Sequence, residues 1–211
     1  IGFYHKLNPN KKFNIVTKLP KINEINIENK LNKYLEVLNV DSIYTMMFHS
    51  YDSYKKNLDL FENLKEIKFS KKIKNIGVSL YTNNNILKVI KNKDIDLIQI
   101  PYNLFDNDYQ RADVLKKAKR CKKIIHTRSP FLQGLFFKNT NTMPANLEPL
   151  REPLEKLKRI AASESLSIEE LAIGYASSMN FIDNILIGVD SLDQLKKNMN
   201  VLLNSISKEL V

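Results

Sequence analysis

The chain has 211 residues, of which 43% are hydrophobic, and its formal net charge is +10 at pH 7. This length and apolar content exclude a disordered chain and suffice for one folded core, and no apolar run reaches the roughly 20 residues of a membrane span. The one cysteine, Cys121, excludes an internal disulfide and fits the reducing cytoplasm.

The positive charge raises the question of a nucleic-acid partner, because clustered Lys and Arg neutralise phosphates. Here the lysines are spread along the chain among Asn, Asp and Glu, and no aromatic signature of RNA-binding domains is present. We therefore expect a solvated lysine surface and no nucleic-acid partner. Such a surface also draws anionic cofactors and substrates toward the protein.

Short apolar runs alternate with stretches of helical periodicity along the chain. Six strands are expected, at residues 13–18, 43–48, 76–79, 97–101, 123–127 and 184–188. Strands that alternate with helices indicate parallel pairing through helical crossovers, and continuous apolar runs indicate strands that are covered on both faces.

Several helix starts can be read from capping residues. Asn85 is expected to cap a short helix. Ser167 with Glu170, and Ser191 with Gln194, form capping-box patterns ahead of two later helices. Residues 136–153 are rich in Asn, Thr and Pro and are expected to form a surface loop.

Lys18 and His49 each close an apolar run, FNIVTK and SIYTMMFH. Polar side chains at the carboxyl ends of successive parallel strands form the active-site rim of an α/β barrel. The pair alone is weak evidence, because a strand-terminal Lys is usually a solvated charge and a lone His is usually a core residue.

Four further motifs occur in a fixed order: IGVS at 76–79, IQIPYN at 98–103, RSPFLQG at 128–134, and a closing Gly188, Gln194 and Asn198. Together with the VTK sequence that ends at Lys18, and with His49, these motifs in this order closely resemble the aldo-keto reductase family over nearly the whole chain. The resemblance implies an α/β TIM (β/α)₈ barrel. The first strand here matches the family's third, so we expect an incomplete barrel of about six parallel strands, with residues 1–211 as a single, N-terminally truncated domain.

The resemblance implies an oxidoreductase that reduces a small-molecule carbonyl substrate (an aldehyde, ketone or sugar-type compound) by hydride transfer from NADPH or NADH, without a metal. Lys18 and His49 match two of the family's catalytic residues. The family's Asp and Tyr normally lie upstream of the first strand here, so the fragment alone would lack the acid. The alternative is a catalytically inactive protein of the same fold that binds a nicotinamide nucleotide. No feature of the sequence sets the oligomeric state.

The resemblance also implies which residues bind the cofactor, from the nicotinamide to the adenosine end. They are Ser79 and Gln99 at the carboxamide, Arg128 against the nicotinamide ring, Ser129, Leu132 and Gly134 in the pyrophosphate loop, and Gly188, Gln194 and Asn198 toward the adenosine. Two positions depart from the pattern: Leu80 follows Ser79 where relatives often have Asn, and Asp190 stands where a basic residue commonly grips the 2′-phosphate. The sequence therefore leaves open whether the cofactor is NADP or NAD.

Overall fold

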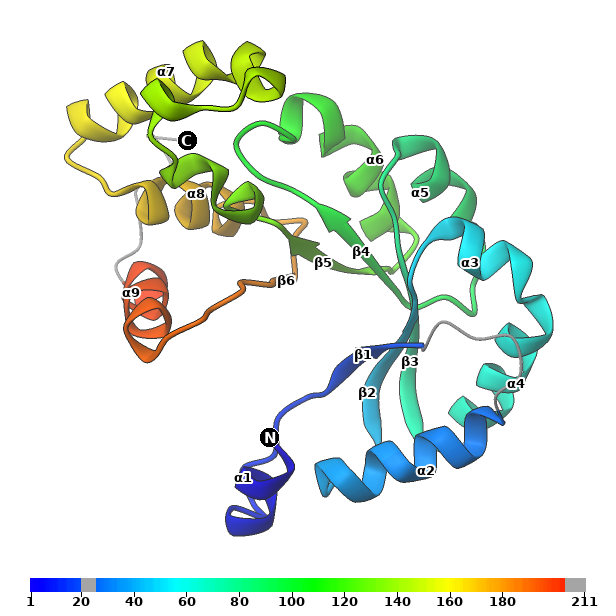
Figure 1. Ribbon diagram of the computed structural model, residues 1–211. Helices are drawn as coiled ribbons and strands as arrows, with labels where there is room; N and C mark the ends of the chain where they lie inside the picture. Colours follow the sequence, from blue (N-terminus) through cyan, green and yellow to red (C-terminus); the bar gives the residue numbers. More distant parts are fainter. Residues whose placement is uncertain (20–25, 204–211) are drawn as a thin grey trace. The chain divides into compact units, whose positions relative to one another are not determined.

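The computed structural model describes residues 1–19 and 26–203, which form two compact units. Unit 1 holds Ile1–Gln99 and Lys116–Ile124, and unit 2 holds Ile100–Leu115 and Ile125–Val211. The fold is α/β, and its six strands are ordered along the sheet as they are along the chain (Figure 1). The predicted incomplete barrel of six parallel strands is confirmed.

The strands are β1 (Val16–Lys18), β2 (Ile43–Phe48), β3 (Ile73–Ser79), β4 (Leu97–Pro101), β5 (Ile124–Arg128) and β6 (Asn184–Ile185). Three bounds differ from expectation by three residues, and both bounds of β5 lie one residue later than expected. β1 begins three residues later than expected, β3 begins three earlier, and β6 ends before Gly188. Backbone pairing sets these bounds, and an apolar run does not report where its partner strand starts and stops.

Five helices belong to unit 1: α1 (Gly2–Leu7), α2 (Ile27–Leu38), α3 (Tyr51–Lys56), α4 (Leu58–Phe69) and α5 (Asn83–Val89). Helices α3 and α4 cover the strand face that carries Phe48, whose ring centroid lies 5.6 Å from that of Tyr54 and 6.4 Å from that of Phe61. Alternate residues of a strand point to opposite faces, so Met47 and His49 belong to the other face.

The cap of α5 is Thr82, so the prediction of Asn85 was wrong. The Thr82 hydroxyl accepts from the backbone N–H of Asn85 at 3.2 Å, and Thr82 has the extended backbone of an N-cap. Thr and Asn both cap helices well, and the sequence pattern indicated Asn85, which lies three residues after the actual cap.

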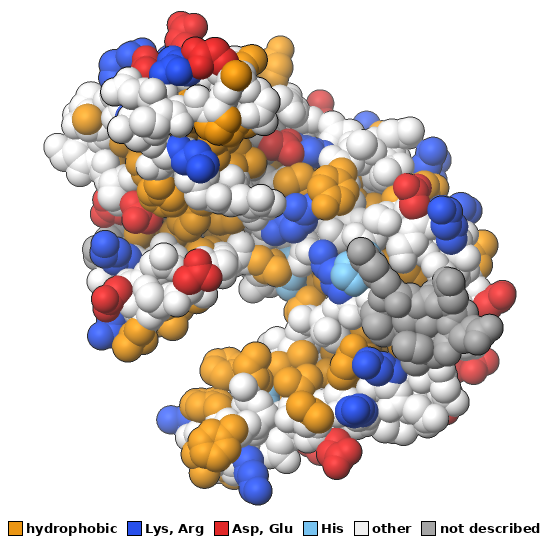
Figure 2. Space-filling model, in the orientation of Figure 1, with side chains coloured by type: hydrophobic (Ala, Val, Ile, Leu, Met, Phe, Trp, Pro, Cys, Tyr) orange, Lys and Arg blue, Asp and Glu red, His pale blue; other side chains and the backbone are white. Residues whose placement is uncertain are grey.

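Lys and Arg side chains are scattered over the molecular face drawn in Figure 2, with Asp and Glu among them. No helix within the described ranges combines the length and apolar character needed to cross a membrane.

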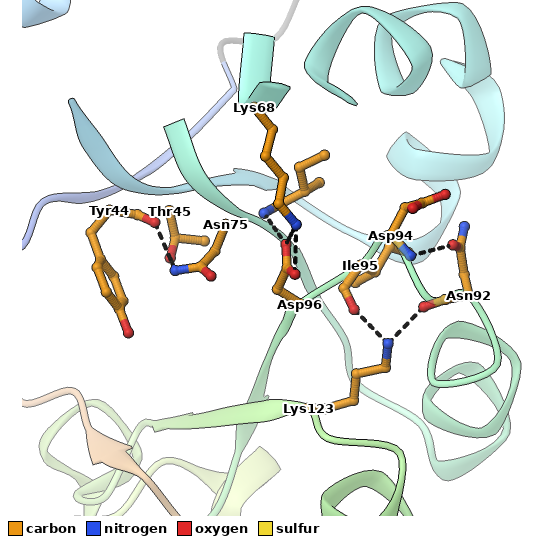
Figure 3. Close-up of polar contacts among 10 residues, drawn as sticks. Tyr44, Thr45, Lys68, Asn75, Asn92, Asp94, Ile95, Asp96 and Lys123 are labelled. Carbon is orange, nitrogen blue, oxygen red and sulfur yellow. Dashed lines mark hydrogen bonds and ion pairs between the residues drawn. The ribbon is translucent and has the colours of Figure 1, made fainter. Parts of the chain in front are cut away.

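A group of polar contacts links the middle of β3 to the residues just before β4 and β5 within unit 1 (Figure 3). Asp96, just before β4, accepts from Lys68 Nζ with both carboxylate oxygens at 2.6 Å, and its Oδ2 also accepts from the Ile76 N–H at 2.8 Å. Lys123, just before β5, donates to the backbone carbonyls of Asn92 and Ile95 at 2.6 and 2.5 Å. Charged side chains thus satisfy backbone groups at the end of the sheet opposite the predicted site.

Unit 2 contains α7 (Arg151–Ser163), α8 (Ile168–Ser177) and α9 (Leu192–Leu203), while α6 (Asp108–Arg120) contributes to both units. The expected surface loop at 136–153 is instead mostly short 3₁₀ helices, η1 (Leu132–Phe137), η2 (Thr140–Thr142) and η3 (Ala145–Leu150). Phe136 and Met143 are buried here against Leu154 and Leu157 of α7. The polar composition hid these few apolar anchors, which have no regular period.

The predicted capping box of α8 is confirmed. Ser167 Oγ accepts from the Glu170 N–H at 3.1 Å, and Glu170 Oε2 accepts from the Ser167 N–H at 2.7 Å. At α9 only half of the predicted box forms. Ser191 Oγ accepts from the Gln194 N–H at 3.2 Å, but Gln194 Oε1 accepts from the Asp190 N–H, one residue earlier than a capping box requires.

Candidate active site and cofactor pocket

Four predicted site residues lie at or near the carboxyl ends of the strands of unit 1. Lys18 ends β1, His49 directly follows β2, Ser79 ends β3, and Gln99 lies inside β4. Parallel strands bring their carboxyl ends to one edge of a sheet, so residues far apart in sequence meet there.

The strand register places these four residues on the same sheet face. Lys18 pairs with Met47, Met47 pairs with Gly77, and Ser79 pairs with Gln99. His49 and Ser79 each lie two residues beyond a member of this set, which returns the side chain to the same face. This is the face opposite to Phe48 and its helices.

The polar side chains on this face differ in how far they are exposed to solvent. Lys18 is half-buried and His49 is exposed, whereas Ser79 and Gln99 are only 1% and 3% exposed. The Ser79 hydroxyl is buried without a hydrogen-bond partner among the described residues. Because a buried polar group without a partner is costly, this hydroxyl is suited to bind a ligand.

Gly77 allows the strands to come close beneath these side chains. A Cβ at this position would lie 2.9 Å from Met47 Cγ and 3.2 Å from the Leu97 carbonyl oxygen. A larger residue would displace β2 or β4 directly below the predicted site.

A cavity of about 1000 Å³ lies within unit 2. Its lining includes six of the seven predicted cofactor residues of this unit: Arg128, Ser129, Gly134, Gly188, Gln194 and Asn198. The seventh, Leu132, packs against the buried cluster around Phe136. Any part that Leu132 plays in binding would therefore use its backbone.

The loop after β5 has an unusual backbone. Ser129, Leu132, Gln133 and Gly134 all have positive φ, between 46° and 83°. The Leu132 N–H donates to the Ser129 carbonyl at 3.1 Å, and the Gly134 N–H donates to the Phe131 carbonyl at 3.0 Å. These turns hold a strained conformation of the kind that clusters at ligand sites, and they already use two of the loop's amides.

Arg128 stands at the end of β5 on the cavity wall, and its Nη1 donates to Ser129 Oγ at 3.4 Å. His126 precedes it by two residues, on the same strand face, and is 4% exposed. Burial lowers the pKa of His126, against the opposing attraction of Asp183, so that this imidazole is neutral at pH 7. Arg128 therefore supplies the positive charge of this strand end.

Sequence reasoning missed several residues of the cavity lining: Phe131, Gln133, Phe137, Glu169 and Asp193. Asp193 lies in the first turn of α9, directly before Gln194, so the start of this helix gave a signal for it. Glu169 comes from α8, and no local pattern linked it to this cavity.

The described residues contain no group of three or more His, Cys, Asp or Glu side chains placed to hold a metal ion.

Three solved structures share the fold at low sequence identity. The aldo-keto reductase AKR11C1 from Bacillus halodurans, in its holo form, has a TM-score of 0.75 and 18% identity, over 95% of this chain and 70% of that one. Two Pseudomonas aeruginosa structures assigned as aldo-keto reductases, the second of them PA4992, have TM-scores of 0.59 and 0.64 at 14% identity. They cover 84% and 92% of this chain and 58% and 67% of those proteins. No curated protein matches the chain.

The model of the Aldo/keto reductase family matches residues 2–211, nearly the whole sequence. The motif order, the six parallel strands and the similarity to the solved structures agree with this match. The chain belongs to the aldo/keto reductase family.

Proposed function

We propose that this chain carries the dinucleotide site and two catalytic residues of an oxidoreductase that reduces a carbonyl compound with NADPH or NADH. The observation that carries the proposal is the cavity of unit 2, whose lining includes six of the seven residues that the family resemblance assigns to cofactor binding in this unit. Its volume is at the upper end of the roughly 300–1,000 Å³ of small-molecule and cofactor sites.

Two features of the described residues fit such a cofactor. The buried Ser79 hydroxyl lacks a partner and can bond a carboxamide. Asn198 lines the cavity at 7% exposure. An Asn amide pairs in bidentate fashion with the N6 and N7 edge of adenine. A buried hydroxyl without a partner, such as that of Ser79, favours a ligand that completes its hydrogen bonds.

The catalytic part of the proposal rests on Lys18 and His49. A bound nicotinamide supplies the hydride. His49, exposed after β2, donates a hydrogen bond that orients the carbonyl oxygen, and Lys18 places a positive charge beside the oxygen, where negative charge develops. Both residues lie on the polar sheet face of unit 1.

The dinucleotide site can be tested by fluorescence titration of the 211-residue chain with NADPH and NADH. Arg128→Ala should weaken binding about tenfold, because stacking of a cation on an aromatic ring is worth on the order of 1 to 2 kcal/mol in a partly desolvated site. Arg159→Ala, an exposed arginine of α7 outside the cavity, is the control. Equal affinities in all three proteins would contradict the assignment.

For catalysis, we expect the 211-residue polypeptide to bind the dinucleotide without reducing simple aldehydes. Neither Lys18 nor His49 replaces the family's tyrosine, and loss of a general acid typically costs about 10² to 10⁴ in rate. Oxidation of NADPH by aldehyde, followed at 25 °C, measures this. Robust oxidation that Lys18→Met abolishes would contradict this expectation and show that the chain is a complete catalyst.

A further inference from the structure

The cavity of unit 2 has an uneven distribution of charge. Three carboxylates line it, Glu169 of α8, Asp190 just before α9 and Asp193 in the first turn of α9. The basic side chains in the lining are Arg128, at the end of β5, and Lys197 of α9. Two of the three carboxylates thus lie at the start of α9, on the part of the wall that also carries Gln194 and Asn198.

Asp190 is held in place at this wall by the start of the helix. Its backbone N–H donates to Gln194 Oε1 at 2.7 Å, and the Gln194 N–H donates to Ser191 Oγ at 3.2 Å. These two bonds fix the backbone on both sides of the helix start. The Asp190 side chain is exposed, so its carboxylate is open to a ligand in the cavity.

Asn198 indicates which part of a ligand would lie here. It is buried and it lines the cavity. It lies four residues after Gln194, hence on the same side of α9. The family resemblance places the adenosine at Gln194 and Asn198, and Asp190 and Asp193 line the same cavity beside them in the chain.

Resting on the proposed function, we propose that the pocket selects NADH over NADPH and that Asp190 is the specificity-determining residue. A carboxylate accepts hydrogen bonds from the ribose hydroxyls of NADH, which is how dinucleotide-binding proteins of another fold recognise NAD. The 2′-phosphate of NADPH adds a second negative group beside Asp190 and Asp193 and is repelled. Lys197 offsets this only in part, because three carboxylates line the same cavity.

Binding of NADH and NADPH to the 211-residue chain, measured by isothermal titration, tests the proposal. We expect NADH to bind roughly tenfold or more tightly than NADPH, a difference of about 1.4 kcal/mol. The ratio of the NADH affinity to the NADPH affinity should fall at about 1 M salt, because the Debye length there is only about 3 Å. Titration with 5′-AMP and 2′,5′-ADP should show the same preference, because these fragments carry the adenosine end alone.

Asp190→Arg should raise the affinity for NADPH and lower that for NADH, because the carboxylate that accepts from the ribose hydroxyls is lost, so that the preference shrinks or reverses. Asp113→Arg, at an exposed position of α6 outside the cavity, makes the same change in net charge and should leave the preference intact.

Each outcome has a distinct meaning. NADPH binding as tightly as NADH to the unmodified chain, or an Asp190→Arg variant with an unchanged preference, would overturn the inference while the proposed function stands. Binding of neither nucleotide at millimolar concentration would refute the proposed function of this chain, and the inference with it.

Discussion

Lys123 is a charged residue in an interior position. It is 4% exposed, and its ammonium group donates to the carbonyls of Asn92 and Ile95, which lie between α5 and β4. Burial lowers its pKa, and the coulombic attraction of Asp96 opposes the shift. Two backbone carbonyls thus depend on one ammonium group for their hydrogen bonds.

Replacing Lys123 by Met should lower the free energy of unfolding by about 1 to 3 kcal/mol, because the two carbonyl oxygens lose their donor. Urea unfolding measures this, and Lys117→Met, at an exposed position of α6, is the matched control. Equal stability of the two variants would mean that water replaces the ammonium without cost.

The pH dependence of the free energy of unfolding gives an independent test of the role of Lys123. A lysine whose pKa is lower in the folded state binds more protons in the unfolded state, so its contribution makes stability rise with pH, from the lowered value up to the ordinary 10.5. Unfolding experiments between pH 8 and about 10.5 should show this rise in the unmodified chain. The Met variant should lack that part of it.

At the scale of elements, the start of α8 is set by its capping box, and the helix that follows is buried over most of its length. Tyr175 of this helix stacks on Tyr102 with a centroid distance of 5.5 Å, and its hydroxyl donates to Asp108 at 2.7 Å. Burial raises the pKa of Tyr175 to about 12, so the phenol stays protonated at physiological pH. A shift of the helix start would disturb this buried contact.

Ser167→Ala should destabilise unit 2 by about 1 kcal/mol, the usual cost of losing an N-cap. Ser163→Ala, near the end of α7, removes a hydroxyl that caps no helix start and is the control. Thermal unfolding measures both variants. If both variants lost the same stability, the loss would come from removing any serine hydroxyl and not from removing the N-cap.

The Glu170 half of the box adds a pH dependence. The hydrogen bond from the Ser167 backbone lowers the pKa of Glu170, so its contribution to stability is present above the ordinary carboxyl pKa and is lost as pH falls through the lowered value. Glu170→Gln keeps an acceptor for the Ser167 N–H and should remove this acid-side loss.

At the scale of the whole molecule, exposed apolar side chains lie close in sequence to the edge strand β1 of unit 1. β1 pairs with β2, and within the described ranges no strand pairs with its other edge. Close by in the chain, Phe3, Leu7 and Phe13 are 77, 64 and 56% exposed. An open strand edge flanked by exposed apolar side chains favours association between chains.

We therefore expect the 211-residue polypeptide to self-associate as its concentration rises, in sedimentation velocity runs. Phe3→Glu should reduce this association. Phe69→Glu makes the same change at an exposed site on α4 and should not. A monomer at all concentrations would contradict this expectation, and it would show that other parts of the chain cover the edge of β1.

The sequence by itself determined the parallel α/β order, the family and the residues that end β1 to β4. Apolar runs such as IDLIQI and the VTK ending of β1 are local signals, because a strand buried on both faces needs continuous apolar residues wherever it lies. The capping box at Ser167 is equally local, since both of its partners lie within four residues.

Only the tertiary structure decided which of these signals are used and which residues meet. It chose Thr82 over Asn85 as a cap, turned Gln194 toward the Asp190 amide, and buried Phe136 and Met143 in what read as a polar loop. It also brought Glu169 from α8 to the cavity that Asp190 lines. The physical reason is that caps and strand pairs follow short-range backbone geometry, whereas a cavity wall depends on contacts between segments that the sequence does not place side by side.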